Sequence, residues 1–218
     1  MRYGSAVKPG GGTARAFVQV DAAGTPKQVG VAISEAAMNN LPDGANLVLD
    51  FPAEGSKTPF KHIALGYLHH GHEPVGVYDK PHFDVHFYTI PNADRLAITM
   101  DKQAQLAKDP AAGYLPAGHI NAGSVPAMSV HWIDPTGDEF SAKGFSKTFI
   151  YGAYDGKVIF YEPMLTTAYI KATQDEVTPI KQPQKVAQAG YYPGAYLVRY
   201  NATDKQYEIA LDQLAMKQ

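Results

Sequence analysis

Residues 147–164 read KTFIYGAYDGKVIFYEPM, in which two runs rich in β-branched and aromatic residues flank Asp155-Gly156. An Asp-Gly pair between two such runs is typical of a tight turn that joins antiparallel strands. The stretch therefore predicts a β-hairpin. Its second run is strongly apolar apart from Glu162. A carboxylate there either needs a partner, if it is buried, or faces solvent on an edge strand just before Pro163.

The strand pattern continues on both sides of this hairpin. A short helix is expected from Ser34, as its cap, to Asn40, and a longer one over 92–109, with Leu96, Met100 and Leu106 roughly on one face. Many short strands without a βαβ alternation predict a mainly β fold, namely an antiparallel β-barrel or a barrel-like sandwich with one or two helices. The further predicted strands cover 14–21, 27–34, 45–52, 61–69, 82–90, 127–134, 194–200 and 206–214.

Length and composition narrow the classes of protein. The 218 residues fit one domain, expected over 14–218 after a flexible, Gly-rich lead-in over 1–13. A net charge of −2 without a basic run argues against nucleic-acid binding. The absence of cysteine excludes disulfides, thiolate zinc sites and cysteine nucleophiles. No run is long and apolar enough for a transmembrane segment, and none at the start resembles a signal peptide. Either the protein is cytoplasmic, or a signal peptide has been removed and Met1 is not native.

The stretch HFDVHFY (82–88) is the strongest candidate for a site. On a strand, alternate residues share a face. His82, Asp84, His86 and Tyr88 would then form an ionisable face, opposite a core face of Phe and Val. Imidazoles with a carboxylate suit a divalent first-row metal. However, residues four apart on a regular strand are roughly 13 Å apart. His82 and His86 could share an ion only if the strand bulges, which the preceding Pro81 would permit.

Other parts of the chain must complete such a shell. We predict His82, His86, His131 and Glu162 as ligands of a divalent transition metal, zinc before others, in the mouth or interior of the barrel. Asp84 would orient a histidine. In the loop HHGHEPVG, His72 and Glu73 are predicted as catalytic proton carriers, and His72 is also a candidate for a further ligand, because Pro74 makes the following chain rigid. The remaining histidines are expected on the surface (His69 and His70) or in structural positions (His62 and His119).

Four blocks of the sequence carry a family resemblance. They are GHEPVGVYDKPHFDVHFY (71–88), MSVHWID (128–134), FIYGAYDGKVIFYEPM (149–164) and GYYPGAYLVRYNATDKQYEIAL (190–211). The chain resembles, over roughly 45–212 and only weakly in its N-terminal third, a bacterial family of unknown function typified by a Thermus protein. The resemblance implies a barrel-like all-β fold and a periplasmic or secreted location. The matching polar positions are His72, Glu73, His82, Asp84, His86, His131 and Glu162.

Two classes of function fit these observations. The first is a metal-binding protein that carries out metal-assisted hydrolysis or isomerisation of a small molecule, or that only sequesters the metal in the envelope. The second is a non-enzymatic module for small-ligand binding or assembly in the cell envelope, with the histidines as a structural network. The fourteen tyrosines are typical of an aromatic lining or a subunit interface, so a homo-oligomer is also expected.

Overall fold

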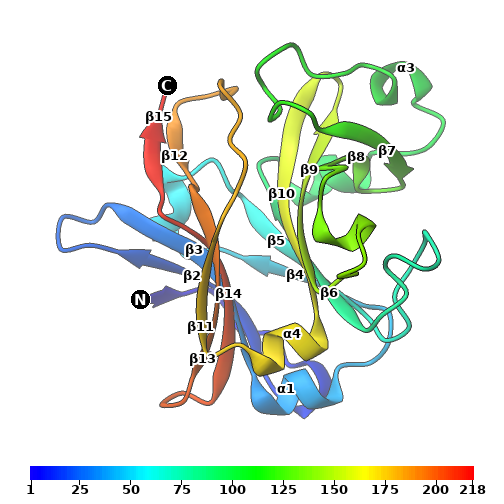
Figure 1. Ribbon diagram of the computed structural model, residues 1–218. Coiled ribbons are helices and arrows are strands. Elements are labelled where there is room, and N and C mark those ends of the chain that lie inside the picture. Colours follow the sequence, from blue (N-terminus) through cyan, green and yellow to red (C-terminus); the bar gives the residue numbers. More distant parts are fainter.

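Two antiparallel sheets and a small two-stranded sheet form the molecule in the computed structural model, which describes residues 1–218 (Figure 1). In order, the first sheet contains β1 (Arg2–Tyr3), β2 (Ala14–Val20), β3 (Pro26–Ser34), β14 (Gln206–Asp212), β13 (Ala195–Asn201) and β11 (Asp175–Pro179). The second contains β4 (Ala45–Asp50), β5 (His62–Leu68), β6 (His82–Tyr88), β10 (Lys157–Thr166), β9 (Lys147–Tyr154), β8 (Ser129–Ile133) and β7 (Ile120–Val125). The third pairs β12 (Gly190–Tyr192) with β15 (Ala215–Lys217).

The mainly β fold class and the hairpins are confirmed. β2 pairs with β3, β9 with β10, and β13 with β14. At the turn between β9 and β10, Asp155 and Gly156 have φ values of 48° and 75°. Positive φ at both central residues is what a tight hairpin turn requires, and Asp-Gly supplies it at little cost.

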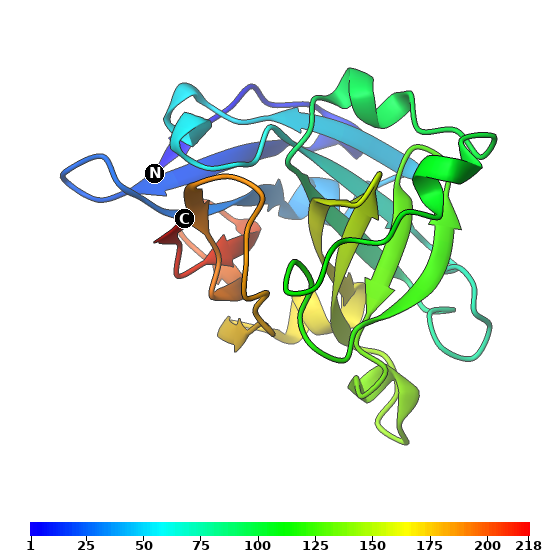
Figure 2. The same cartoon turned by 90° about the horizontal axis from the view of Figure 1, so that it is seen from above.

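Of the two architectures that we predicted, the closed barrel is wrong and the sandwich-like arrangement is confirmed. The first sheet ends at β1 and β11 and the second at β4 and β7, so the two sheets pack as an open, sandwich-like pair (Figures 1 and 2). Alternating strand patterns are the same in barrels and sandwiches, because both bury one face of each strand. The sequence pattern therefore could not separate the two architectures.

The helices are shorter than predicted. The first, α1 (Glu35–Asn40), is confirmed, with Ser34 Oγ accepting a hydrogen bond from the Ala37 amide at 3.3 Å. The single helix over 92–109 is wrong. It is two short helices, α2 (Asn92–Leu96) and α3 (Gln103–Leu106), and α4 (Thr167–Ala172) is additional.

The break between α2 and α3 follows from burial. The Ile98 amide bonds to the Arg95 carbonyl three residues earlier, which closes a turn instead of extending the helix. This turn buries Ile98, whereas Leu96 is 56% exposed. Of the apolar face that the spacing predicts, Leu96 and Met100 are exposed and only Leu106 is buried. No helix has the length and apolar character that a membrane span needs.

The second sheet is buried on both faces. One face packs against the first sheet in a core of 27 buried residues, to which Phe83, Val85 and Phe87 contribute. The other face is covered by the loop between β5 and β6 and by the first part of the segment between β6 and β7, which contains α2 and α3 (Figures 1 and 2). As a result, every residue of β6 is buried. Its ionisable residues lie in a second core and not against solvent.

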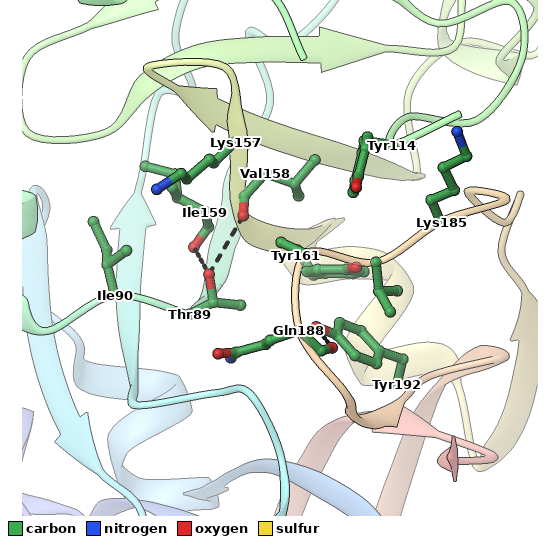
Figure 3. Close-up of a pocket in the computed structure, with 12 residues that line it drawn as sticks. Thr89, Ile90, Tyr114, Lys157, Val158, Ile159, Tyr161, Lys185, Gln188 and Tyr192 are labelled. Carbon is green, nitrogen blue, oxygen red and sulfur yellow. Dashed lines mark hydrogen bonds between the residues drawn. The ribbon is translucent and has the colours of Figure 1, made fainter. Parts of the chain in front are cut away.

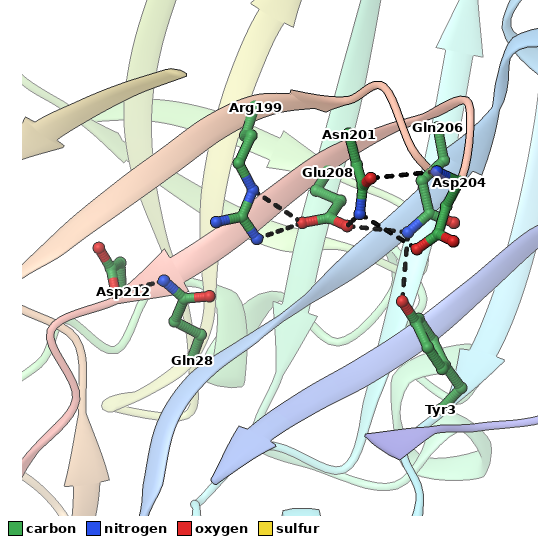
Figure 4. A network of polar contacts seen from close by, with 8 residues as sticks. All are labelled: Tyr3, Gln28, Arg199, Asn201, Asp204, Gln206, Glu208 and Asp212. Carbon is green, nitrogen blue, oxygen red and sulfur yellow. Dashed lines mark hydrogen bonds and ion pairs between the residues drawn. The ribbon is translucent and has the colours of Figure 1, made fainter. Parts of the chain in front are cut away.

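A polar network stabilises the outer face of the first sheet (Figure 4). Glu208 on β14 is fully buried and accepts hydrogen bonds from Arg199, Gln206 and Asn201. Gln206 also donates to the Tyr3 hydroxyl at 3.2 Å, which links β1 to the network. Within the lead-in expected over 1–13, Arg2 and Tyr3 thus form a paired strand. The flexibility that we expect for this segment stays a prediction.

Candidate metal centre

Strand register brings Glu162 and His86 together. β6 and β10 keep one register on both sides of Glu162 and Pro163, with Tyr161 opposite Phe87 and Met164 opposite Asp84. The same register sets Glu162 opposite His86. Because residues directly opposite each other in a sheet project to the same face, both side chains lie on the covered face of the second sheet. The possibility that Glu162 faces solvent is excluded, since the residue is only 2% exposed.

A glycine lets His131 reach the same place. His131 on β8 pairs with Gly152 on β9, which pairs in turn with Phe160 on β10. A Cβ on Gly152 would lie 1.8 Å from the Phe160 ring. The missing side chain therefore leaves room for this ring, whose centroid lies 4.8 Å from that of His86 and 5.2 Å from that of His131.

His86, His131 and Glu162 converge on a common point. Each offers one ligand atom, and these atoms all lie within 4.8 Å of one another. His86 Nε2 is 3.3 Å from Glu162 Oε1, and His131 Nε2 is 3.9 Å from Oε2. Ligands at 2.0–2.1 Å from a tetrahedral ion are roughly 3.4 Å apart. Shifts of less than about 1 Å would therefore bring the three residues to a coordination geometry.

The polar atoms of this group lack other partners. The His86 Nε2 and Glu162 Oε2 atoms are buried without a hydrogen bond. Buried polar atoms are nearly always paired, so these two atoms are candidates for binding a further group. Burial also lowers the pKa of His86 to about 3 and that of His131 to about 4. Burial, with the nearby negative charge of Asp84, raises the pKa of Glu162 well above its usual range.

The tautomer of His131 suits metal binding. Its Nδ1 lies 3.1 Å from the Ser129 carbonyl oxygen, which can only accept. Nδ1 must then carry the proton, and Nε2, which faces Glu162, has a free lone pair. Metal-bound histidines usually donate their second nitrogen to a carbonyl or carboxylate in this way.

His82 lies in a different group. β6 pairs with β5 without a register shift from His82 to Tyr88, so the strand has no bulge between His82 and His86. Instead, the His82 Nε2 is 3.1 Å from Asp84 Oδ1, and His72 completes this second group. The structure thus brings together three of the four predicted ligands and separates the fourth. Both groups lie on the far face of the second sheet, not in a barrel mouth or interior.

The predicted proton carriers lie in the loop between β5 and β6. His72 is exposed, with Nδ1 donating to the Glu73 carbonyl at 2.5 Å. The Glu73 side chain is exposed and belongs to neither group. A catalytic role for either residue stays a prediction.

One buried charge near the site was not predicted. Arg95 on α2 is 4% exposed, its Nε donates to Asn92 Oδ1 at 2.8 Å, and its guanidinium lies 5.5 Å from the centre of the Tyr88 ring. The Tyr88 ring stacks on that of His86. Helical spacing could not identify Arg95 as buried, because the predicted apolar face included Leu96, which is exposed in the structure.

A cavity of about 260 Å³ lies on the opposite face of the second sheet (Figure 3). Tyr161 and Tyr192, both members of the core between the sheets, line it. Thr89 donates to the backbone of β10 along one wall, at the Ile159 carbonyl. Lys157 and Lys185 add two cations to a largely apolar lining. The cavity is therefore separate from the histidine groups.

Comparison with known proteins supports the family resemblance. The family model described as TTHB210-like, hypothetical protein TTHB210, matches residues 21–67, which confirms a likeness to a family typified by a Thermus protein. The matched segment runs from the β2–β3 turn to β5 and lies ahead of the histidine-rich blocks. It includes part of the N-terminal third, where we expected the weakest likeness. Curated proteins and solved structures give no match.

Proposed function

We propose that this chain binds one divalent transition-metal ion, zinc before others, through His86, His131 and Glu162. The observation that supports this most is that one ligand atom from each residue lies within 4.8 Å of the others, in a group where His86 Nε2 and Glu162 Oε2 are buried without a hydrogen bond. The match to an uncharacterised family is consistent with the proposal but assigns no activity.

Charge balance favours a cation at this point. Glu162 has no lysine or arginine partner, and its only ion-pair neighbours are His86 and His131. Both imidazoles are neutral at pH 7, since burial holds the pKa of each far below 7. A buried carboxylate without a positive partner is costly. A divalent ion would remove this cost and would accept lone pairs from the two imidazoles as well.

The number of ligands leaves room for chemistry. Three protein ligands are typical of catalytic zinc sites, whereas structural sites use four. A zinc-like ion bound there would acidify a water molecule or polarise a carbonyl group. The His131 side chain is 15% exposed, compared with 3% for His86 and Glu162, so a small molecule would approach past His131. Hydrolysis or isomerisation of such a molecule is the reaction class that we propose, with His72 or Glu73 as proton carrier.

Zinc titration of untagged, metal-depleted protein tests the binding site. Glu162→Gln keeps the shape of the side chain but removes its negative charge. We expect this variant and His131→Ala each to lose one equivalent of tightly bound zinc. His69→Ala removes an exposed imidazole outside both groups and should bind as the wild type does. Wild-type zinc stoichiometry in both site variants would refute the site.

Cobalt substitution separates a catalytic centre from mere sequestration. Cobalt(II) in a site with an open position changes its visible spectrum when azide is added, because azide becomes a ligand. A site closed by further protein ligands would leave the spectrum unchanged. We expect a change in the His72→Ala background, where the group of His72, His82 and Asp84 has lost a ligand, and no cobalt spectrum of this kind when Glu162→Gln is added to that background.

The cavity supports a second candidate function, the binding of a small apolar anion. Its lining combines tyrosine rings with Lys157 and Lys185 (Figure 3). The fluorescent aromatic sulfonate 1-anilinonaphthalene-8-sulfonate is a suitable probe. Saturable binding that is lost when Ala187→Trp fills the cavity would support this function, which does not depend on the metal centre. A periplasmic or secreted location and a homo-oligomeric state stay proposals.

A further inference from the structure

We propose that His72, His82 and Asp84 form a second, solvent-connected site for a divalent transition-metal ion. Their ligand atoms all lie within 4.8 Å of one another, as in the first group. The proposal does not depend on the first centre, because the two groups share no residue. It also gives roles to His82 and Asp84, which the first centre leaves unused, and with His72 as a ligand here Glu73 alone remains as proton carrier for the first centre.

Two buried atoms point to a ligand at this place. His82 is completely buried and Asp84 is 7% exposed. The His82 Nε2 and Asp84 Oδ1 atoms are only 3.1 Å apart, yet neither has a hydrogen bond of proper geometry. The two atoms form an ion pair when His82 is protonated, and when His82 is neutral both can bind a metal ion instead.

The protonation of both histidines suits metal ligation. His82 Nδ1 donates to the Lys80 carbonyl at 2.7 Å, and His72 Nδ1 donates to the Glu73 carbonyl at 2.5 Å. In the neutral form of each imidazole, the lone pair is then on Nε2. Backbone carbonyls that hold the outer nitrogen of a histidine are the usual support of a metal ligand.

The loop between β5 and β6 is built to present His72. The His72 amide donates to the Tyr78 carbonyl at 3.1 Å, which closes the loop on itself. Gly71 has a φ of 71°, and a Cβ there would lie 2.0 Å from the same carbonyl oxygen, so only glycine fits. This closure places the His72 ring 4.8 Å from that of His82.

The second ion would be separate from the first and more labile. His82 and His86 are four residues apart on a regular strand, roughly 13 Å, too far to share one ion. His72 is exposed, whereas all residues of the first group are buried or half-buried. Exchange with free metal should therefore be faster at the second site. Two imidazoles and one carboxylate suit zinc, cobalt or nickel better than magnesium or calcium.

Zinc binding to the full chain and to matched loop variants tests the proposal. Because His72 is exposed, His72→Ala should fold normally, and His70→Ala removes another exposed imidazole from the same loop. We expect two equivalents of zinc in the wild type and in His70→Ala. In His72→Ala, the affinity of the protein for the more weakly bound zinc equivalent should fall by at least ~10-fold. Loss of an outer-shell partner already costs this much, and His72 is a direct ligand in the proposal. The NMR signals of the His72 and His82 Nε2 atoms should shift on zinc addition.

The outcomes separate the two sites. If Glu162→Gln loses one equivalent while His72→Ala binds zinc as the wild type does, the second site is refuted and the first stands. If His72→Ala loses one equivalent while Glu162→Gln loses none, the second site stands and the first fails. Unchanged His72 and His82 signals at saturating zinc would overturn the present proposal whatever the total stoichiometry.

Discussion

Glu162 and His86 lie side by side on neighbouring strands, with 3.3 Å between Oε1 and Nε2, and each side chain is only 3% exposed. A neutral imidazole cannot balance a buried carboxylate. The pair therefore makes sense either with a protonated Glu162 or with a bound cation. The convergence of His131 on the same carboxyl group favours the cation.

Zinc should stabilise the wild-type protein but not Glu162→Gln at the first centre. A ligand that binds only the folded state at 100 times its Kd adds about 2.7 kcal/mol to the free energy of unfolding. To isolate this effect, thermal melts should use the His72→Ala background, with and without zinc. A zinc-induced rise in Tm of equal size with Gln at position 162 would contradict the assignment of the ligand.

Gly152→Ala should destabilise the fold and weaken the first centre together. Its Cβ would overlap the Phe160 ring, and overpacking of this kind costs about 1–3 kcal/mol. A displaced Phe160 ring would also disturb His86 and His131, so zinc affinity should fall. Gly194→Ala is the matched control, since its Cβ would have only ordinary contacts, at 3.5 Å or more. Denaturant unfolding and zinc titration measure the two effects. Equal behaviour of the two variants would count against this packing argument.

His62 should make the protein sensitive to acid. Its two ring nitrogens are buried without partners, and burial, together with the positive charge of Arg95, lowers its pKa from 6.5 to about 4. A depressed histidine pKa stabilises the fold above the unfolded value of 6.5, and this contribution disappears as the pH falls from 6.5 to about 4.

His62→Phe retains a ring to stack on Tyr88 and should remove this contribution. We expect the loss of unfolding free energy from pH 7 to pH 5 to be smaller in the variant by about 2 kcal/mol. Chemical denaturation of metal-free protein at the two pH values checks this. Parallel pH profiles of the variant and the wild type would show that His62 is already protonated, or hydrated, in the folded state.

The Arg199–Glu208 pair should be costly to break from one side. Arg199→Met leaves the fully buried Glu208 without its cation, and such a loss typically costs 3–5 kcal/mol. The double variant Arg199→Met/Glu208→Leu should recover much of this stability, because no buried charge remains. Lys143→Met, which breaks an exposed pair with Asp138, should change stability by less than about 1 kcal/mol. Similar losses of unfolding free energy in Arg199→Met and Lys143→Met would show that burial of Glu208 does not decide the cost of breaking the pair.

Local patterns predicted much of the fold and part of the site. Asp155-Gly156 identified its hairpin, because a turn with positive φ depends on a few adjacent residues. The alternation in HFDVHFY placed His82, Asp84 and His86 on one face, and this face carries both groups. Glu162 was expected to need a partner if buried, because its strand is strongly apolar, and the residue is indeed buried.

What could not be predicted depends on contacts between distant parts of the chain. The register of β6 and β10 decides that Glu162 meets His86 and not Asp84, and no local pattern encodes it. His72 joins His82 only because the intervening loop folds back. The choice between a barrel and an open pair of sheets depends on edge strands such as β7 and β11, which the sequence pattern did not reveal.

An anomalous-scattering map at the zinc absorption edge, from crystals of protein equilibrated with zinc, tests the central claim most directly. We predict a peak within coordination distance of His86 Nε2, His131 Nε2 and the Glu162 carboxylate, at about 2.0–2.2 Å from each. A map in which these three residues hold no ion at saturating zinc would contradict the proposed metal centre.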